Sequence, residues 1–355
     1  MKTFLMMLLT VALTNLSDNY IKPEESAVVY YSPSTTIQVD FVFTEETCEK
    51  GIYADYAEPL LGITDAIQEN QKTYTLTDVN IYTSTDVDLN RVHKVAANKD
   101  FPIQLLSINE RGLLTGYNLP PVTKEHRHKA PKLETVSKIE PARPLQLPEE
   151  VVDAKTPSEK AHAIARYIFH LREVRTYLLS GEVEHAPADG EAMRLVLEEL
   201  DNQERQLIEL FIGTKTIVTK HETIQCRPMG DDFKRWDRDL YFSKENGFTT
   251  EENIDAEKIE IRTEFQHQFR QPEEAQKKKS NKKNPDVSEP SQLVYNLPGN
   301  ARVLVQYRSQ QLKSKVVPVA QFGMDVPLSK DLFTGATLPS IVFNEKTGNI
   351  ISISK

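Results

Sequence analysis

The stretch of sequence that decides the fold is AVVYYSPSTTIQVDFVF, residues 27–43. Apolar side chains recur at every second position from Ile37 to Phe43, and this period of two is typical of a β-strand with one buried face. The apolar run before it is also typical of a strand, and Pro33 and Ser34 predict a turn between the two. The chain is therefore expected to begin its folded part with antiparallel β structure.

The same pattern returns near the other end of the chain. LVYNLPGNARVLVQY at residues 293–307 again places a Tyr-x-x-Pro motif before an alternating strand. Each copy is later followed by a hairpin signal, INERGL at 108–113 and FNEKTG at 343–348, in which glycine can supply the positive φ of a tight turn. Two interpretations stay open: a duplicated β module, or repeated use of favourable turn chemistry.

Helical periodicity occupies the middle of the chain. Thr156-Pro157-Ser158-Glu159 is a capping box with proline at the first helical position, and Gly181 is a suitable stop. A second helical stretch runs from about Asp189-Gly190 to Phe211. The short connection between the two predicts an antiparallel helical hairpin.

These patterns predict an α+β fold in which two mainly antiparallel β modules flank a central antiparallel helical hairpin. The expected divisions are a signal peptide at 1–17, an N-terminal β-rich domain at 18–118, a Pro-rich linker at 119–148, the helical hairpin at 149–213, and a C-terminal β-rich domain at 214–355 with a mobile loop at 271–292.

Charged residues interrupt the apolar stripes of both predicted helices. Arg175 lies on the stripe of the first helix with Arg172 beside it, and Glu204 lies on the stripe of the second. An unpaired charge on a core-facing stripe costs several kcal/mol, on the order of 3–5. We therefore expect an inter-helix ion-pair cluster of Arg172, Arg175 and Glu204, with Asp189 as an alternative partner. A second hypothesis is that the two arginines bind a carboxylate or phosphate ligand.

The N-terminus predicts export. Met1 and Lys2 precede a short apolar run, Phe4 to Leu13, which is about half the roughly 20 residues that span a bilayer and suits a signal peptide. An oxidising compartment would permit a disulfide between Cys48 and Cys226, the only two cysteines; two free thiols are the alternative. A periplasmic or cell-envelope location is expected.

Charge limits the class of partner. The chain has a net charge of −9, and residues 18–118 hold 16 acidic against 7 basic residues. An acidic module repels nucleic acid, so no nucleic-acid partner is expected. After signal removal no segment is apolar enough to predict a transmembrane span.

Several motifs of the central and flanking segments resemble a known family. The first set is IFHLREVR at 168–175 with LLSGE at 178–182, and PADG at 187–190, LDNQE at 200–204 and LFIG at 210–213 follow. Together with the Tyr-x-x-Pro strands and the C-terminal hairpin, they resemble the exported bacterial family called domain of unknown function 4831. The resemblance extends over most of the mature chain and implies export from a Gram-negative cell. It implies no activity, so it transfers no catalytic residue.

No phosphate-binding loop, nucleophile elbow or metal-ligand set stands out, and no cofactor, metal or catalytic residue is assigned. The favoured hypothesis is a non-enzymatic binding or assembly module whose partner is an envelope protein or glycan. The alternative is an exported hydrolase acting on envelope glycan or peptide, which requires a cleft lined by two acids. Trp236, among charged residues, is interpreted either as the edge of a core or as part of a sugar or peptide site.

Overall fold

A computed structural model describes residues 27–96, 102, 105–119, 147–181, 190–228, 236–252, 255–267, 292–335 and 337–354, without the side chains of 265–267. The predicted signal peptide, nearly all of the predicted Pro-rich linker and mobile loop, and Asp189 lie outside these residues. The described part contains antiparallel sheets and helices, as the α+β prediction requires.

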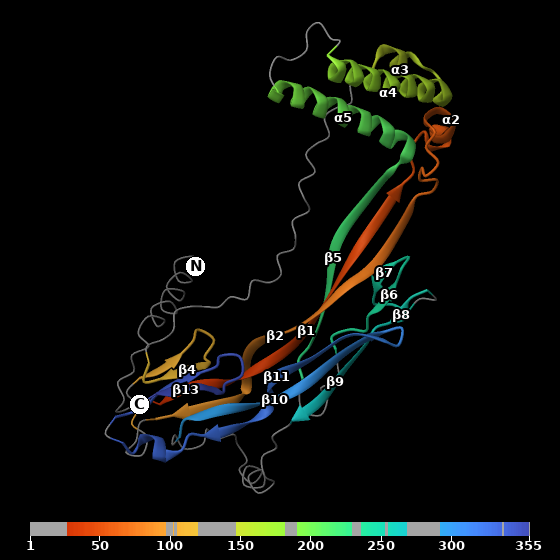
Figure 1. Ribbon diagram of the computed structural model, residues 1–355. Helices are drawn as coiled ribbons and strands as arrows, with labels where there is room; N and C mark the ends of the chain where they lie inside the picture. The colour runs from red at the N-terminus through yellow and green to blue at the C-terminus, as the bar shows by residue number, and fades with distance from the viewer. Residues whose placement is uncertain are drawn as a thin grey trace, which may run out of the picture.

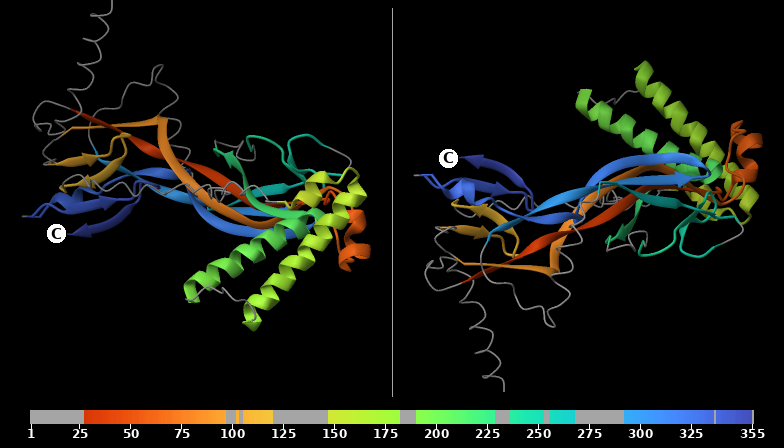
Figure 2. Two further views of the ribbon diagram at one scale, coloured as in Figure 1. Left: turned by 90° about the horizontal axis from the view of Figure 1, so that it is seen from above. Right: turned by 90° about the horizontal axis from the view of Figure 1, so that it is seen from below.

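The molecule is elongated and has three parts (Figure 1). The head consists of the helices between Ala54 and Leu61 and between Glu149 and Ile212. The stalk is a three-stranded ribbon of residues 44–49, 71–75 and 214–219. The base contains the remaining strands. The head helices lie across the end of the stalk instead of continuing its axis (Figure 2).

Sheet A forms the stalk and continues into the base. Its order is β2-β1-β5, and all neighbours are antiparallel; the strands are β1 (Val28–Glu49), β2 (Gln71–Val95) and β5 (Thr214–Cys226). The turn predicted at Pro33 is wrong, because β1 runs through it without a break. The irregularity lies instead in β2, where the register shifts opposite Tyr31 and Ser32. Pro33 is tolerated because β5 pairs with β1 only from Ile37 onward, so β1 has a described strand on one side alone at Pro33.

Sheet E packs against the lower half of sheet A. Its order is β11-β10-β9, with β9 (Glu260–His267), β10 (Val294–Tyr307) and β11 (Gln310–Pro327). The alternating residues Ile37, Val39 and Phe41 are fully buried against Val303 and Val305 of β10. The period of two in the sequence thus marks the inner faces of a two-sheet sandwich.

Two smaller sheets complete the base. One has the order β13-β12-β4-β3, and the other β7-β6-β8. Their strands are β3 (Leu106–Ile108), β4 (Leu114–Tyr117), β6 (Tyr241–Ser243), β7 (Gly247–Thr249), β8 (Glu257–Lys258), β12 (Ser340–Phe343) and β13 (Ile350–Ser354), and a short helix η2 (Lys330–Phe333) precedes β12. Tyr30, Tyr117 and Ile341 lie in the core beneath the four-stranded sheet.

The head is formed by α4 (Pro157–Ser180) and α5 (Gly190–Ile212), with three short helices, η1 (Ala54–Tyr56), α2 (Ala57–Leu61) and α3 (Glu149–Asp153). The predicted capping box is present, since Thr156 accepts from the Glu159 N–H and the Glu159 side chain accepts from Thr156. Gly181 ends α4 with φ +76°, as the sequence predicts. Ile164, Ile168, Leu207 and Phe211 form the centre of the head core.

Strands from the two sides of the helical hairpin share sheets. β5 follows the helices but pairs with β1 along its whole length, and β12 pairs with β4. The β strands are therefore not arranged as one set of sheets before the helices and a separate set after them. The long pairing of β5 with β1 returns the chain from the head to the base.

The internal resemblance of the two ends extends to backbone hydrogen bonds. Tyr31 N–H donates to the Gly112 carbonyl at 2.9 Å, and the equivalent Asn296 N–H donates to the Gly348 carbonyl at 3.0 Å. Both glycines have positive φ. The two copies thus share a long hairpin that is bonded to the glycine turn of a following short hairpin, which favours duplication over chance turn chemistry.

Candidate functional site

A cluster of chemically reactive side chains lies in the base, where the two long hairpins meet. It combines Ser32 of β1, Asp88, Arg91 and His93 of β2, and Asp325 of β11. The shifted register of β2 turns Arg91 inward, where its Nη2 donates to the Pro33 carbonyl at 2.7 Å. Each of these side chains is largely buried.

Asp325 is the centre of this base cluster. Its Oδ1 accepts from Ser32 Oγ at 3.0 Å and from Arg91 Nη1 at 3.3 Å, and its Oδ2 lies 3.5 Å from His93 Nε2. Burial opposes ionisation, but the hydrogen bonds from His93 and Ser32 and the charge of Arg91 outweigh it and lower the pKa of the Asp325 carboxyl. Asp325 is therefore a bound carboxylate at neutral pH.

The combination of serine, histidine and aspartate invites comparison with a hydrolytic triad. Ser32 Oγ lies 2.7 Å from His93 Nε2, which is suitable for proton transfer. In a working triad, however, the serine donates to the histidine and the acid binds the other ring nitrogen. Here Ser32 donates to Asp325, and Asp325 approaches the same ring nitrogen as the serine. The geometry favours a structural hydrogen-bonding role for Ser32 over that of an activated nucleophile.

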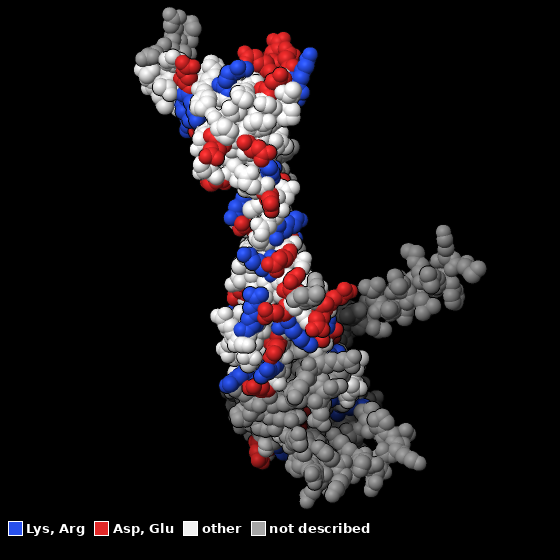
Figure 3. Space-filling view, turned by 90° about the vertical axis from the view of Figure 1, so that its right-hand side faces the viewer, with Lys and Arg blue, Asp and Glu red and all other residues white. Residues whose placement is uncertain are grey.

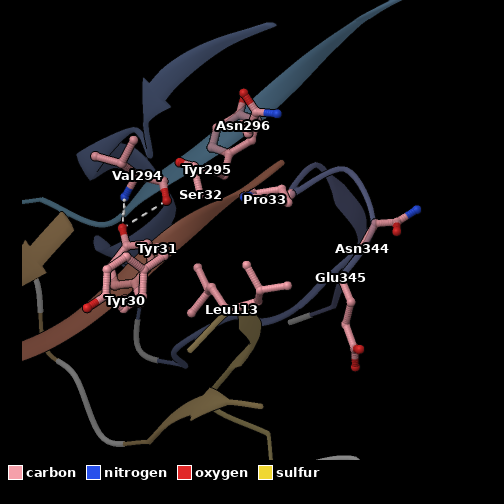
Figure 4. Close-up of a pocket in the computed structure, with 12 residues that line it drawn as sticks. Tyr30, Tyr31, Ser32, Pro33, Leu113, Val294, Tyr295, Asn296, Asn344 and Glu345 are labelled. Atoms are coloured by element: carbon pink, nitrogen blue, oxygen red, sulfur yellow. Dashed lines mark hydrogen bonds between the residues drawn. The ribbon is translucent and has the colours of Figure 1, made fainter. Parts of the chain in front are cut away.

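The space beside the base cluster is very small. Tyr30, Ser32, Val294 and Asn296 line a cavity of about 10 Å³ (Figure 4), which is room for one water-sized sphere. Tyr30 Oη donates to the Val294 carbonyl at 2.9 Å and accepts from the Val294 N–H at 2.8 Å. Burial raises the pKa of Tyr30 well above its ordinary value, so it stays a neutral hydrogen-bonding group. No substrate fits here without movement of the backbone.

A larger groove lies on the side of the base. Its volume is about 490 Å³, and its apolar lining consists of Ile224, Trp236, Leu240, Ile259 and Ile261. Its two acids are each paired with a cation, Asp239 with Lys258 at 2.9 Å and Glu260 with Arg262 at 2.6 Å. Trp236 contacts the sandwich core, as the first interpretation requires, and it also lines this groove.

The charged residues of the head stripes lie together. Arg172 Nε donates to Glu204 Oε1 at 2.7 Å, and Arg175 Nη2 lies 2.9 Å from Glu204 Oε2. Arg175 also pairs with Asp201, a residue that the apolar stripe did not indicate. Both guanidinium groups are therefore engaged within the protein, which removes the main support for a ligand-carrying role.

The two cysteines form no disulfide with each other, so the Cys48–Cys226 bridge is wrong for this fold. Cys226 lies opposite Ile37 of β1, whereas Cys48 is itself on β1 and lies opposite Lys215. Eleven residues of strand separate the two positions, or about 36 Å at roughly 3.3 Å per residue. Burial also raises the pKa of Cys226 to about 11, so its thiol is a poor nucleophile.

Charges elsewhere on the surface are mixed in sign. Lys, Arg, Asp and Glu side chains are interleaved along the stalk (Figure 3). Among the described residues, no three His, Cys, Asp or Glu side chains come close enough to hold a metal ion. The helices in that part of the chain are also too short or too polar to cross a bilayer.

The fold defines an elongated α+β protein of antiparallel sheets with a helical head. The charged side chains of the base cluster and of the head stripes are paired with other side chains of the same chain. A family model described as domain of unknown function (DUF4831) matches residues 26–351, and the chain belongs to this family. Comparison with curated proteins and with solved structures gave no match.

Sequence reasoning missed the base cluster. Ser32 and His93 lie 61 positions apart on the paired strands β1 and β2, Asp325 lies 293 positions after Ser32 on β11, and no motif joins the three. The one available signal was the repeat, since Ser32 and Asn296 lie in the two matching Tyr-x-x-Pro strands. Asn296 indeed contacts Arg91 at 3.3 Å.

Proposed function

We propose that this protein is an exported component of the cell envelope that acts as a non-enzymatic binding or assembly module. The observation that carries the proposal is the three-part shape, in which a polar stalk holds a helical head away from a rigid base (Figure 1). An extended scaffold with surfaces at its far end suits contact with a partner better than it suits enclosure of a substrate.

The exposed side chains of the head support this role. Phe169, Tyr177 and Leu179 of α4 and Leu195 of α5 are exposed, and Leu179 is 66% accessible. Exposed apolar side chains at the far end of an extended scaffold are available for contact with a partner. The partner class is an envelope protein or glycan.

A hydrolase has less support. Its strongest candidate nucleophile, Ser32, donates to a carboxylate and faces a cavity of only about 10 Å³. The groove near Trp236 is large enough for a ligand, but both of its acids are held by cations.

The test combines location with capture. Cell fractionation should recover the mature chain in the envelope, and tagged mature protein should then retain one partner at a fixed ratio. Leu179→Ser with Leu195→Ser should reduce retention at least tenfold, whereas Ile351→Ser in the base, a residue of similar exposure at 61%, should not. Cytoplasmic recovery, or turnover of an envelope glycan or peptide library, would overturn the proposal.

A further inference from the structure

The groove beside Trp236 lies at an edge of the two-sheet sandwich. Among the described strands, β5 is at one edge of sheet A and β9 is at one edge of sheet E, and residues of both strands line the groove. Its volume of about 490 Å³ is within the range of ligand pockets, roughly 300–1,000 Å³. Its apolar lining belongs to the core of the sandwich, so the fold itself holds these side chains in place.

Hydrogen bonds fix the segment that carries Trp236. The Asp237 N–H donates to the Gln225 carbonyl of β5 at 3.0 Å, and Arg238 Nη2 donates to the Thr223 carbonyl at 2.9 Å. This wall of the groove is therefore attached to the edge of sheet A. A wall that is already ordered costs a ligand little conformational entropy on binding.

Trp236 gives the groove an aromatic surface. Its side chain is partly buried against the sandwich core and lines the groove together with Ile224 and Ile261. Tryptophan combines a large, flat, apolar ring with few rotatable bonds, and it often dominates the energy of a binding site. These residues favour a ligand that has a flat apolar face.

The charged side chains of the groove form pairs of opposite sign, which are Lys258 with Asp239, Arg262 with Glu260, and Arg238 with Glu222 outside the lining. An ionic ligand therefore meets a side chain of its own sign beside each one that attracts it. A purely apolar ligand would remove water from these charges without replacing its hydrogen bonds. The pairs favour a neutral ligand with many hydrogen-bonding groups.

Hydroxyl groups suit such pairs, because each hydroxyl both donates and accepts. Within the described residues Arg262 donates to Glu260 through Nη2 alone, so its other N–H groups can donate to a ligand. A pyranose ring with equatorial hydroxyls has polar groups around its rim and apolar C–H groups on its faces. One sugar unit thus combines the flat face that Trp236 favours with the donors and acceptors that the charge pairs favour.

We propose that the groove between β5 and β9 binds a neutral pyranose oligosaccharide, with a sugar ring packed on Trp236 and hydroxyls bonded to the Asp239–Lys258 and Glu260–Arg262 pairs. Because cations hold both carboxylates, the sugar is bound and not cleaved. This inference rests on the proposed binding function and assigns the glycan part of that function to the base. The exposed apolar side chains of the head remain available for a protein partner.

The test uses the only tryptophan of the chain, whose fluorescence reports directly on the groove. Titration of the intact chain with a trimer of β-1,4-linked N-acetylglucosamine should change the Trp236 emission in a saturable way, with a dissociation constant below about 1 mM. Calorimetry should give the same constant. A trimer of galacturonic acid and a capped Ala-Val-Ala peptide should each bind about tenfold more weakly or not at all.

Substitutions separate the aromatic surface from the charge pairs. Trp236→Ala should weaken binding of the sugar trimer, measured by calorimetry, about tenfold or more, while Trp236→Tyr keeps an aromatic ring and should retain most of the affinity. Arg262→Ala removes a side chain that is 61% exposed and should weaken binding about threefold. Because this residue lies at the surface, the second variant tests the proposal even if Trp236→Ala unfolds.

The matched control is Arg166→Ala in the head, which also breaks an exposed arginine–glutamate pair and should leave sugar binding unchanged. Thermal unfolding within a few degrees of the wild type excludes general misfolding of a variant. The inference is overturned if the sugar trimer does not bind, if the acidic trimer or the peptide binds as tightly, or if Arg262→Ala and Arg166→Ala have equal effects.

Failure of this inference can be told apart from failure of the proposed function. Capture of a protein partner by a chain that binds no sugar would refute the inference and leave the proposed function standing. Sugar binding by a chain that is recovered in the cytoplasm would do the reverse. Cleavage of the bound trimer would overturn both.

Discussion

The base and the head each contain a carboxylate held by two cationic or basic side chains, yet only one of these clusters could be found from the sequence. Glu204 is held by Arg172 and Arg175, and only two helices separated by a short connection bring them together. Asp325 is held by Arg91 and His93, more than 200 residues earlier in the chain. Helical periodicity in the sequence predicts the Glu204 cluster. The Asp325 cluster is visible only once the arrangement of the strands is known.

Gly323 in the base and Gly62 in the head differ in the space around them. At Gly323 of β11, a Cβ atom would lie 1.8 Å from the Leu297 carbonyl oxygen of β10. Gly62, by contrast, ends α2 with φ +71° and has nothing within 4 Å of an added Cβ.

The largest expected effect comes from Gly323→Ala. The strands β10 and β11 shift register between Leu297 and Gly299, and the overlap with backbone forces this bulge to open. The free energy of unfolding should fall by about 4 kcal/mol. Urea titration followed by circular dichroism measures this loss. Gly190→Ala, at a position with nothing within 4 Å, is the matched control and should change stability by less than about 0.5 kcal/mol. Equal effects would show that the close approach in the base is absent.

Asp325→Ala is expected to cause the second-largest loss of stability. It leaves Arg91 as a buried cation with Asp88 as its remaining acid, and it removes the acceptor of Ser32. We expect a loss of about 3 kcal/mol, because breaking a buried ion pair strands its partner. The same urea titration measures it, and a loss below about 1 kcal/mol would mean that the base cluster does not tie the hairpins together.

Glu204→Ala should lower the free energy of unfolding by less, about 2 kcal/mol. The Arg172 side chain is 41% exposed, so water replaces part of the lost interaction. A double-mutant cycle with Arg172→Ala should give a coupling energy of about 1 kcal/mol. If Glu204→Ala lowers the free energy of unfolding more than Asp325→Ala does, burial does not explain the difference in stability between the two clusters.

Thr156→Ala tests the head alone. Loss of the capping box should cost about 1 kcal/mol and increase hydrogen exchange in the first turn of α4. Amides of sheet E should exchange at unchanged rates, since the cap touches nothing in the base. Faster exchange in both places would show that head and base unfold as one unit.

The smallest effect is a pH dependence specific to the base. Because the pKa of Asp325 is lowered in the folded state, its contribution is present above the unfolded value near 3.9 and is lost as pH falls through the lower folded value. Between pH 5 and 2.5 the wild type should therefore lose more stability than Asp325→Asn. Parallel curves would contradict the lowered pKa.

The sequence by itself determined the local elements of this protein. The capping box at Thr156, the stop at Gly181, the alternation from Ile37 to Phe43 and the stripe that carries Glu204 all depend on residues within a few turns or a single strand. Such short-range patterns are fixed by backbone geometry and by the need to bury apolar faces, so they can be read without the fold.

Only the tertiary structure decided how the strands combine. Nothing local to Pro33 states that β1 continues through it, because this depends on where the pairing of β5 with β1 ends. Nor does local sequence reveal that β5 returns to β1, that Cys48 and Cys226 are far apart, or that Ser32, His93 and Asp325 meet. Strand pairing joins residues at any separation, and its register is set by the whole sheet, so these contacts exist only once the chain has closed on itself.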